Sequence, residues 1–150
     1  AMVHETMSLD RGDDVDFDSV ADRLVEMAAD AAGAHAAEQG SARVVREGSF
    51  GVLPATLATP LAMCLSELLL NAAEHSGAHH IELGASRSGR ELRAWVSDDG
   101  QGMAGQGEEN ATSGLGLQIV RALVGDQLAG HLQWDETARG TRIVIDTRIP

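Results

Sequence analysis

The chain has 150 residues, 43% of them hydrophobic, which is enough for one domain with a single core. Its formal net charge is −12, and this acidic balance argues against broad contact with nucleic acid, whose phosphates are bound by basic surfaces. All eleven basic residues are arginine, so a Walker A loop is excluded because its lysine is missing, and the single cysteine excludes an internal disulfide.

Hydrophobic periodicity divides the chain into helices and strands. Apolar residues three or four positions apart indicate helices, and alternating apolar and polar residues indicate strands. Residues 10–16 are polar and residues 48–54 contain glycine and proline, so we interpret them as a loop and a turn region. In chain order, the predicted elements are a helix at 17–32, a strand at 42–47, a helix at 56–75, strands at 80–86 and 91–97, a helix at 115–128 and strands at 131–137 and 141–149.

This order of elements predicts an α/β two-layer sandwich, in which helices cover one face of a mixed β-sheet. The two central strands are expected to form a hairpin that turns at Ser88 and Gly89. The domain is expected to occupy residues 15–150, with residues 1–14 as a separate leading segment. Cys64 lies in an aliphatic run of the second helix, which indicates a buried thiol.

The segment from Gly100 to Gly114 is predicted to be a loop. It is rich in Gly, Gln, Glu, Asn and Ser, and it contains almost nothing to bury except Met103. Loops of this length inside a compact domain are usually functional. We interpret the segment as a mobile lid over a ligand site.

The second predicted helix has two different faces. Its polar face is confined to the last two turns and combines Glu67, Asn71, Glu74 and His75. Such oxygen and nitrogen groups suit a divalent cation, and a carboxylate can also orient or deprotonate a nucleophile; the alternative is a solvated helix end. The apolar face consists of Leu57, Leu61, Leu65, Leu68 and Ala72.

An acidic, glycine-containing run follows the second strand of the central hairpin. Asp98 is placed at the strand end, with Gly100 and Gly102 just beyond it. A carboxylate fixed there can accept a hydrogen bond from an amino group of a planar ligand, and glycines let the backbone approach that ligand closely. A tight acidic turn would explain the same run without a ligand.

A second glycine-containing run opens the third predicted helix. The run consists of Gly114, Leu115, Gly116 and Leu117. A helix start exposes unpaired N–H groups and the positive end of the helix dipole, so it can seat phosphates. The spacing does not fit the dinucleotide-binding G-x-G-x-x-G pattern.

Taken together, these runs resemble the motifs of a known family. Glu67-Leu68-x-x-Asn71-Ala72, Asp98-x-Gly100-x-Gly102, Gly114-Leu115-Gly116-Leu117 and Gly140-Thr141 are similar, in order and spacing, to the N, G1, G2 and final Gly-Thr boxes of the GHKL ATPases. That family includes histidine kinases, gyrase-type topoisomerases, Hsp90 and MutL-type proteins. The resemblance covers Phe17 to Ile149 and implies a Bergerat-type fold with a short ATP lid.

The resemblance implies that the phosphate end of an ATP site is built from the second helix. Asn71 would coordinate Mg²⁺ that bridges the phosphates, and Glu67 would be the polar catalytic residue that faces the γ-phosphate. His75 would lie near the phosphates or the ribose. Many members of the family carry a basic residue at the position of Glu74, so we expect this carboxylate to face outward, away from the phosphates.

The same resemblance implies the base end of the site. Asp98 would accept a hydrogen bond from the adenine amino group, and Gly100 and Gly102 would shape the base pocket. Thr141 would support the adenine from the sheet. The run from Gly114 to Leu117 would close the end of the lid over the phosphates.

The first residues point to one branch of the family. The segment Met2 to Ser8 resembles the V-H-E-T-L-S sequence that ends the second dimerisation helix of PdtaS-type sensor kinases, whose phosphorylated histidine lies upstream. Residues 1–14 are therefore expected to be the end of a dimerisation helix and a linker. His4 precedes a glutamate as an orthodox acceptor does, but it lacks the following proline and second helix, so we interpret it as a helix-end residue.

The resemblance implies the catalytic and ATP-binding domain of a bacterial two-component sensor histidine kinase. It would use ATP and Mg²⁺ to phosphorylate a histidine on its own dimerisation and phosphoacceptor helices, and a response regulator would then receive the phosphate. We expect a monomeric, cytoplasmic domain without membrane contact, unable to autophosphorylate without those helices. The alternatives are a stand-alone anti-sigma-factor serine kinase of the same fold and a non-catalytic nucleotide-sensing module.

Overall fold

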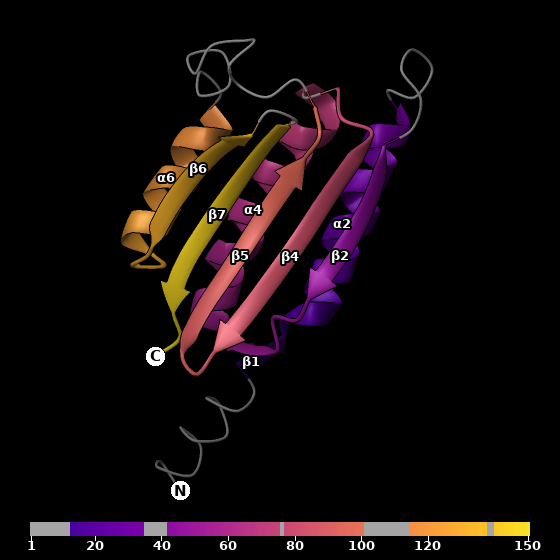
Figure 1. Cartoon of the computed structure of the whole chain (residues 1–150). Coiled ribbons are helices and arrows are strands. Elements are labelled where there is room, and N and C mark those ends of the chain that lie inside the picture. Colours follow the sequence, from indigo (N-terminus) through magenta and orange to yellow (C-terminus); the bar gives the residue numbers. More distant parts are fainter. Residues whose placement is uncertain (1–12, 35–41, 76, 101–114, 138–139) are drawn as a thin grey trace, which may run out of the picture.

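The structure is a computed structural model that describes residues 13–34, 42–75, 77–100, 115–137 and 140–150 (Figure 1). The helices are α2 (Phe17–Ala34), α4 (Ala55–His75) and α6 (Leu115–Asp126). The strands are β1 (Asp14–Asp16), β2 (Arg43–Gly48), β3 (Val52–Pro54), β4 (His80–Ser88), β5 (Glu91–Asp98), β6 (His131–Thr137) and β7 (Gly140–Arg148).

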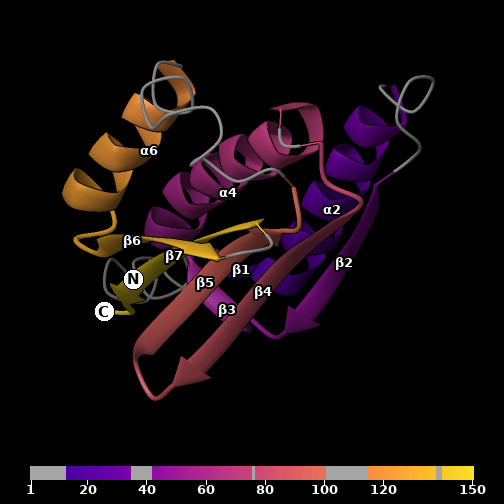
Figure 2. The ribbon, with the colours of Figure 1, turned by 45° about the horizontal axis from the view of Figure 1, so that its top comes forward.

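The two layers are a five-stranded sheet and a set of helices on one of its faces. The strand order is β2-β4-β5-β7-β6, with β2 parallel to β4 and the other neighbours antiparallel. The helices α2, α4 and α6 lie side by side behind the sheet in both ribbon views (Figure 2). The predicted α/β two-layer sandwich is confirmed, and so is the central hairpin of β4 and β5.

The predictions of a loop at 10–16 and a turn region at 48–54 were wrong in part. Each range contains a three-residue strand, and these two strands, β1 and β3, form a separate antiparallel pair. A strand this short is not visible in the sequence, because three residues cannot display alternation. The pair is held from outside as well, since the Phe17 N–H donates to the Gly51 carbonyl at 3.0 Å and the Ala55 N–H to the Asp13 carbonyl at 2.7 Å.

Helix α4 supplies the centre of the core. Every residue of its predicted apolar face is buried, and Cys64 is fully buried beside them, as predicted. The α4 sequence is long and apolar enough to pass for a membrane span by length and composition, but half of that window is buried inside the fold. In this structure its apolar face packs against the sheet and against α6.

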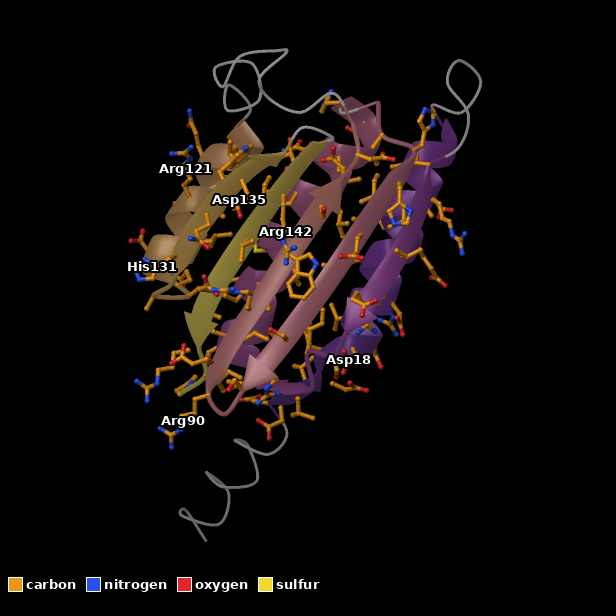
Figure 3. The ribbon with its side chains drawn as sticks, in the orientation of Figure 1. Asp18, Arg90, Arg121, His131, Asp135 and Arg142 are labelled. Atoms are coloured by element: carbon orange, nitrogen blue, oxygen red, sulfur yellow. The ribbon has the colours of Figure 1, made fainter. Side chains whose placement is uncertain are left out.

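Asp18, in the first turn of α2, is a hydrogen-bonding centre that joins this helix to the β2–β3 connection (Figure 3). Burial on its own would raise the pKa of Asp18, but its hydrogen bonds outweigh burial and lower the pKa to about 2. The donors to its carboxylate are the Arg46 guanidinium at 2.6 Å, the Ser49 hydroxyl at 2.8 Å, and the Phe50 and Gly51 N–H groups at 2.8 and 3.0 Å.

The face of the sheet opposite the helices carries Trp95 at its middle. A side chain at Gly84 on the neighbouring strand would collide with the indole ring, so Trp95 lies flat over that glycine. The indole N–H donates to the Glu82 carboxylate at 2.8 Å, and the Arg142 guanidinium lies 4.8 Å from the ring centroid (Figure 3). These contacts cover the open face locally. The position of the Arg142 guanidinium over the Trp95 ring is favourable, because a cation is attracted to the face of an aromatic ring.

Candidate nucleotide site

The segments that carry the sequence motifs meet at one edge of the domain. The carboxyl end of α4, the end of β5, the start of β7 and the start of α6 all lie at the top of the molecule as drawn in Figure 1. The polar face of α4 therefore reaches this edge, since Glu67 and Asn71 lie in the last turns of the helix. Residues far apart in the sequence are gathered there by the topology of the sheet.

Asp98, Gly140 and Thr141 form the sheet side of this edge. Asp98 is directly opposite Thr141 in the pairing of β5 with β7, and Thr141 is buried. A side chain at Gly140 would collide with the Asp98 carbonyl group, so glycine permits this close approach. The second and fourth sequence motifs are thus brought together.

The Asp98 carboxylate is half-buried and fixed in direction. One of its oxygens accepts a hydrogen bond from the Gly100 N–H at 2.9 Å. Burial raises the pKa of Asp98, the hydrogen bond from Gly100 opposes the increase, and the negative charge of Asp99 adds to it. A carboxylate at the end of a strand with one oxygen held by the backbone can present its other oxygen to a donor.

Glu67 and Gly116 form the helix side of the edge. A side chain at Gly116, in the first turn of α6, would collide with the Glu67 carboxylate. The next residue, Leu117, is buried between the layers, and the Cys64 sulfur lies 3.9 Å from the Val120 carbonyl oxygen where α4 and α6 pack together. The first and third motifs are thus in contact.

The remaining polar residues of α4 differ in exposure. Asn71 is half-buried near the end of the helix, whereas Glu74 and His75 are exposed. Their side chains lie 3.8 Å apart, and the exposed fractions are 39% for Glu74 and 69% for His75. Both side chains are open to solvent, and His75 is the most solvent-accessible of the predicted site residues on α4. The direction of Glu74 relative to bound phosphates stays a prediction.

Asp99 was not singled out by the sequence patterns, although it lies beside Asp98. One of its carboxylate oxygens accepts hydrogen bonds from the His79 N–H at 2.8 Å and the His80 N–H at 2.9 Å. Its own N–H donates to the His80 carbonyl at 3.2 Å. Asp99 thereby ties the end of β5 to the turn between α4 and β4, a contact that only the sheet register reveals.

Some of the predicted residues cannot be placed. Gly102 and Gly114 lie outside the described residues, and so does the rest of the predicted lid except Gly100. Leu115 is the first residue of α6. Among the described residues, no group of three or more His, Cys, Asp or Glu side chains could hold a metal ion on its own. A Mg²⁺ ion at this edge would need oxygens from a ligand in addition to Asn71.

Comparison with known proteins gives matches along most or all of the chain. Residues 56–150 match the family described as histidine kinase-, DNA gyrase B- and HSP90-like ATPase. The sensor histidine kinase PdtaS of Mycolicibacterium smegmatis is 37% identical over 156 aligned residues, which cover 100% of this chain and 30% of that protein. PdtaS of Mycobacterium tuberculosis is 36% identical with the same coverage. The chain thus spans about a third of the length of these relatives.

Solved structures show the same fold. The histidine kinase domain of the Erythrobacter litoralis EL346 blue-light activated histidine kinase is 28% identical, with a TM-score of 0.65 over 84% of this chain and 61% of that one. The mycobacterial sensor histidine kinase MprB is 22% identical, with a TM-score of 0.67 over 91% of this chain and 96% of that one. This second likeness concerns the fold alone.

Proposed function

This chain belongs to the family of histidine kinase-, DNA gyrase B- and HSP90-like ATPases, and on that basis we propose that it binds ATP with Mg²⁺ and donates the γ-phosphate to a histidine. The resemblance to the GHKL family is confirmed, and so is the similarity to PdtaS, which was predicted from the first residues and extends over the whole chain. The observation that carries the proposal is the meeting of all four motif-bearing segments at one edge of the sheet.

The base end of the proposed site is the Asp98 carboxylate. It is half-buried and backed by Gly140 and Thr141, and such a fixed acceptor suits an exocyclic amino group of adenine. Gly100 and Gly102 shape the pocket for the ring in this proposal. In this proposal Thr141, which is buried opposite Asp98, supports the ring from the sheet.

The phosphate end lies between α4 and the start of α6. Asn71 would hold Mg²⁺ together with phosphate oxygens, and the run from Gly114 to Leu117 offers the N–H groups of a helix start to the phosphates. Bound Mg²⁺ would neutralise phosphate charge during transfer. The Glu67 carboxylate lies against the same helix start, which supports the proposal that it acts at the γ-phosphate end. His75 would approach the phosphates or the ribose from the exposed end of α4.

Phosphoryl transfer requires little covalent chemistry from these residues. In phosphoryl transfer the protein mainly positions the reactants in line and stabilises charge. The described part of the site contains no lysine, because the chain has none. Neutralisation of the phosphates therefore depends on Mg²⁺ and on backbone N–H groups, and we expect modest nucleotide affinity.

The partners belong to the whole protein. PdtaS relatives are about three times as long as this chain, so the receiving histidine is proposed to lie on their kind of dimerisation and phosphoacceptor helices, and a response regulator is proposed to take the phosphate next. Residues 1–14 would join those helices to the domain at 15–150. The isolated domain is proposed to be monomeric and cytoplasmic.

Phosphotransfer in trans tests the proposal. The chain is mixed with the dimerisation and phosphoacceptor segment of a PdtaS relative and with ATP labelled at the γ-phosphate. Label that appears on the segment, is removed by acid and is lost with Asn71→Ala supports histidine phosphorylation. Acid-stable label would indicate a serine kinase instead. Nucleotide binding without transfer to the segment would favour a non-catalytic nucleotide-sensing module.

A further inference from the structure

Asp99 connects the two segments on which the proposed base site depends. Its Oδ1 accepts the N–H groups of His79 and His80 at 2.8 and 2.9 Å. His79 lies in the connection that follows α4, after Gly77, whose φ of 66° marks a turn, and His80 is the first residue of β4. Asp99 itself comes directly after β5, so one oxygen atom joins the connection after α4 to the end of the strand that carries Asp98.

The position of Asp98 is defined on both sides by close contacts. On one side, Asp98 is paired with Thr141, and its carbonyl group packs against Gly140. On the other side, Asp98 is paired with Ile81, the second residue of β4. The backbone pairing continues one step further, where the Asp99 N–H donates to the His80 carbonyl at 3.2 Å. The Asp99 carboxylate adds to it by accepting the N–H groups of His79 and His80.

The hydrogen bonds also keep Asp99 charged. Burial would raise the pKa of Asp99, but the hydrogen bonds from the His80 and His79 N–H groups lower it. A charge next to Asp98 carries a cost, because it helps to raise the pKa of Asp98. A residue that only ended the strand would not need a side-chain acceptor in this place, whereas Asp99 accepts two backbone N–H groups.

We infer that Asp99 is a positioning residue for recognition of the base: by holding the His79 and His80 N–H groups, it fixes the end of β5 so that the Asp98 carboxylate meets the adenine amino group. The inference rests on the proposed function, which assigns Asp98 to the base. Asp99 itself touches no part of the nucleotide in this scheme. Its effect is therefore on discrimination between bases and leaves the phosphate end unchanged.

A comparison of ATP with ITP isolates this effect, because inosine carries an oxygen where adenine carries the amino group. We would titrate the chain with each nucleotide and Mg²⁺ in a calorimeter, using the native protein, Asp99→Ala and Asp99→Asn. Asparagine retains an oxygen that can accept both N–H groups, whereas alanine retains none. Asp146→Ala is the matched control, since Asp146 pairs with Arg93 at 2.7 Å on the open face of the sheet.

The expected result is a change in preference. The native protein and the control bind ATP about tenfold more tightly than ITP, the ratio that one hydrogen bond to a charged group supports. Asp99→Ala weakens ATP binding about fivefold and leaves ITP binding within about twofold, so the preference nearly disappears. Asp99→Asn restores the native preference. Amide hydrogen exchange at His79 and His80 is faster in the alanine variant alone.

Three results would overturn the inference. The first is an unchanged ATP to ITP ratio in Asp99→Ala, and the second is an equal loss for both nucleotides with a lower melting temperature, which would mark a purely structural residue. The third is an asparagine variant that behaves like alanine. If Asp99→Ala does not fold, Asp99→Glu replaces it, because the longer side chain displaces the acceptor and is expected to narrow the ratio.

Failure of the proposed function gives a different result. A native chain that binds neither nucleotide contradicts the ATP site as a whole. Native binding of ATP that Asp98→Ala weakens, together with an unchanged preference in Asp99→Ala, would refute only the role of Asp99.

Discussion

The Glu67 carboxylate lies against Gly116, in the space that a side chain at that position would fill. This contact links the polar end of α4 to the first turn of α6, through two residues that are almost fifty positions apart in the sequence. A carboxylate at a helix start is favourable there, because the helix dipole is positive at that end. The contact explains why a glycine, rather than another small residue, follows Leu115.

Substitution Gly116→Ala is expected to disturb this contact. The new methyl group displaces the Glu67 carboxylate or shifts the start of α6, so affinity for a non-hydrolysable ATP analogue should fall about tenfold, while the free energy of unfolding should fall by about 1 kcal/mol. Calorimetric titration and urea unfolding measure the two effects.

Gly125→Ala in the same helix is the control, since a Cβ there meets nothing within 4 Å. Its affinity should be native and its stability equal or higher. Equal behaviour of the two variants would contradict the account.

Gly140→Ala is expected to damage both stability and binding. A methyl group at Gly140 meets the Asp98 carbonyl and the backbone of Asp99, neither of which can move without breaking the β5–β7 pairing. We expect a loss of about 2–3 kcal/mol in the free energy of unfolding, measured in urea. Gly33→Ala in α2, where the added Cβ meets nothing within 4 Å, should lose nothing. Native stability of Gly140→Ala would contradict the close contact between Gly140 and the backbone of Asp98 and Asp99.

Asp18 makes the stability of the fold depend on pH in acid. Its pKa is about 2 in the folded protein and 3.8 as the ordinary value, so it stabilises the fold fully above pH 4, and this contribution is lost as pH falls through 4 toward 2. The difference corresponds to about 2 kcal/mol, and partial exposure of the side chain lowers it somewhat. Urea unfolding from pH 2 to 7 should show a smaller acid loss in Asp18→Asn than in the native chain. An equal acid loss in Asp18→Asn and in the native chain would contradict this role of Asp18.

Cys64 is expected to be chemically inert while the domain is folded. Burial raises the pKa of its thiol to about 11, and the sulfur lies between α4 and α6. The thiolate is the reactive form, so alkylation by iodoacetamide at pH 8 should be at least about a hundredfold slower than in urea. Mass spectrometry of timed samples gives the two rates. Rapid labelling of the folded protein would mean that α4 and α6 separate readily.

The sequence predicted the large elements because each carries a full periodic pattern. The apolar face of α4 repeats over five residues from Leu57 to Ala72, and all of them are buried. The short strands β1 and β3 were missed because three residues carry no period. The convergence of Glu67 with Gly116 and of Asp98 with Thr141 followed from the family resemblance, which fixes order and spacing.

Contacts that depend on register or on distant partners could not be predicted. Asp18 meets Phe50 and Gly51 across more than thirty positions, and nothing in the local sequence marks it as different from its acidic neighbours. In the sequence, Asp99 is only the second of two adjacent acidic residues. The β4–β5 register brings its carboxylate to the His79 and His80 N–H groups. The roles assigned to Gly102 and Gly114 remain predictions, since both lie outside the described residues.

The central claim is that Asp98 receives the base of ATP at this edge of the sheet, and one titration tests it most directly. A non-hydrolysable ATP analogue with Mg²⁺ is titrated into the native chain, into Asp98→Ala and into the Asp146→Ala control. The account predicts binding to the native chain and the control, and a loss of about tenfold or more in Asp98→Ala. Binding that is absent from the native chain, or that is unchanged in Asp98→Ala, would contradict it.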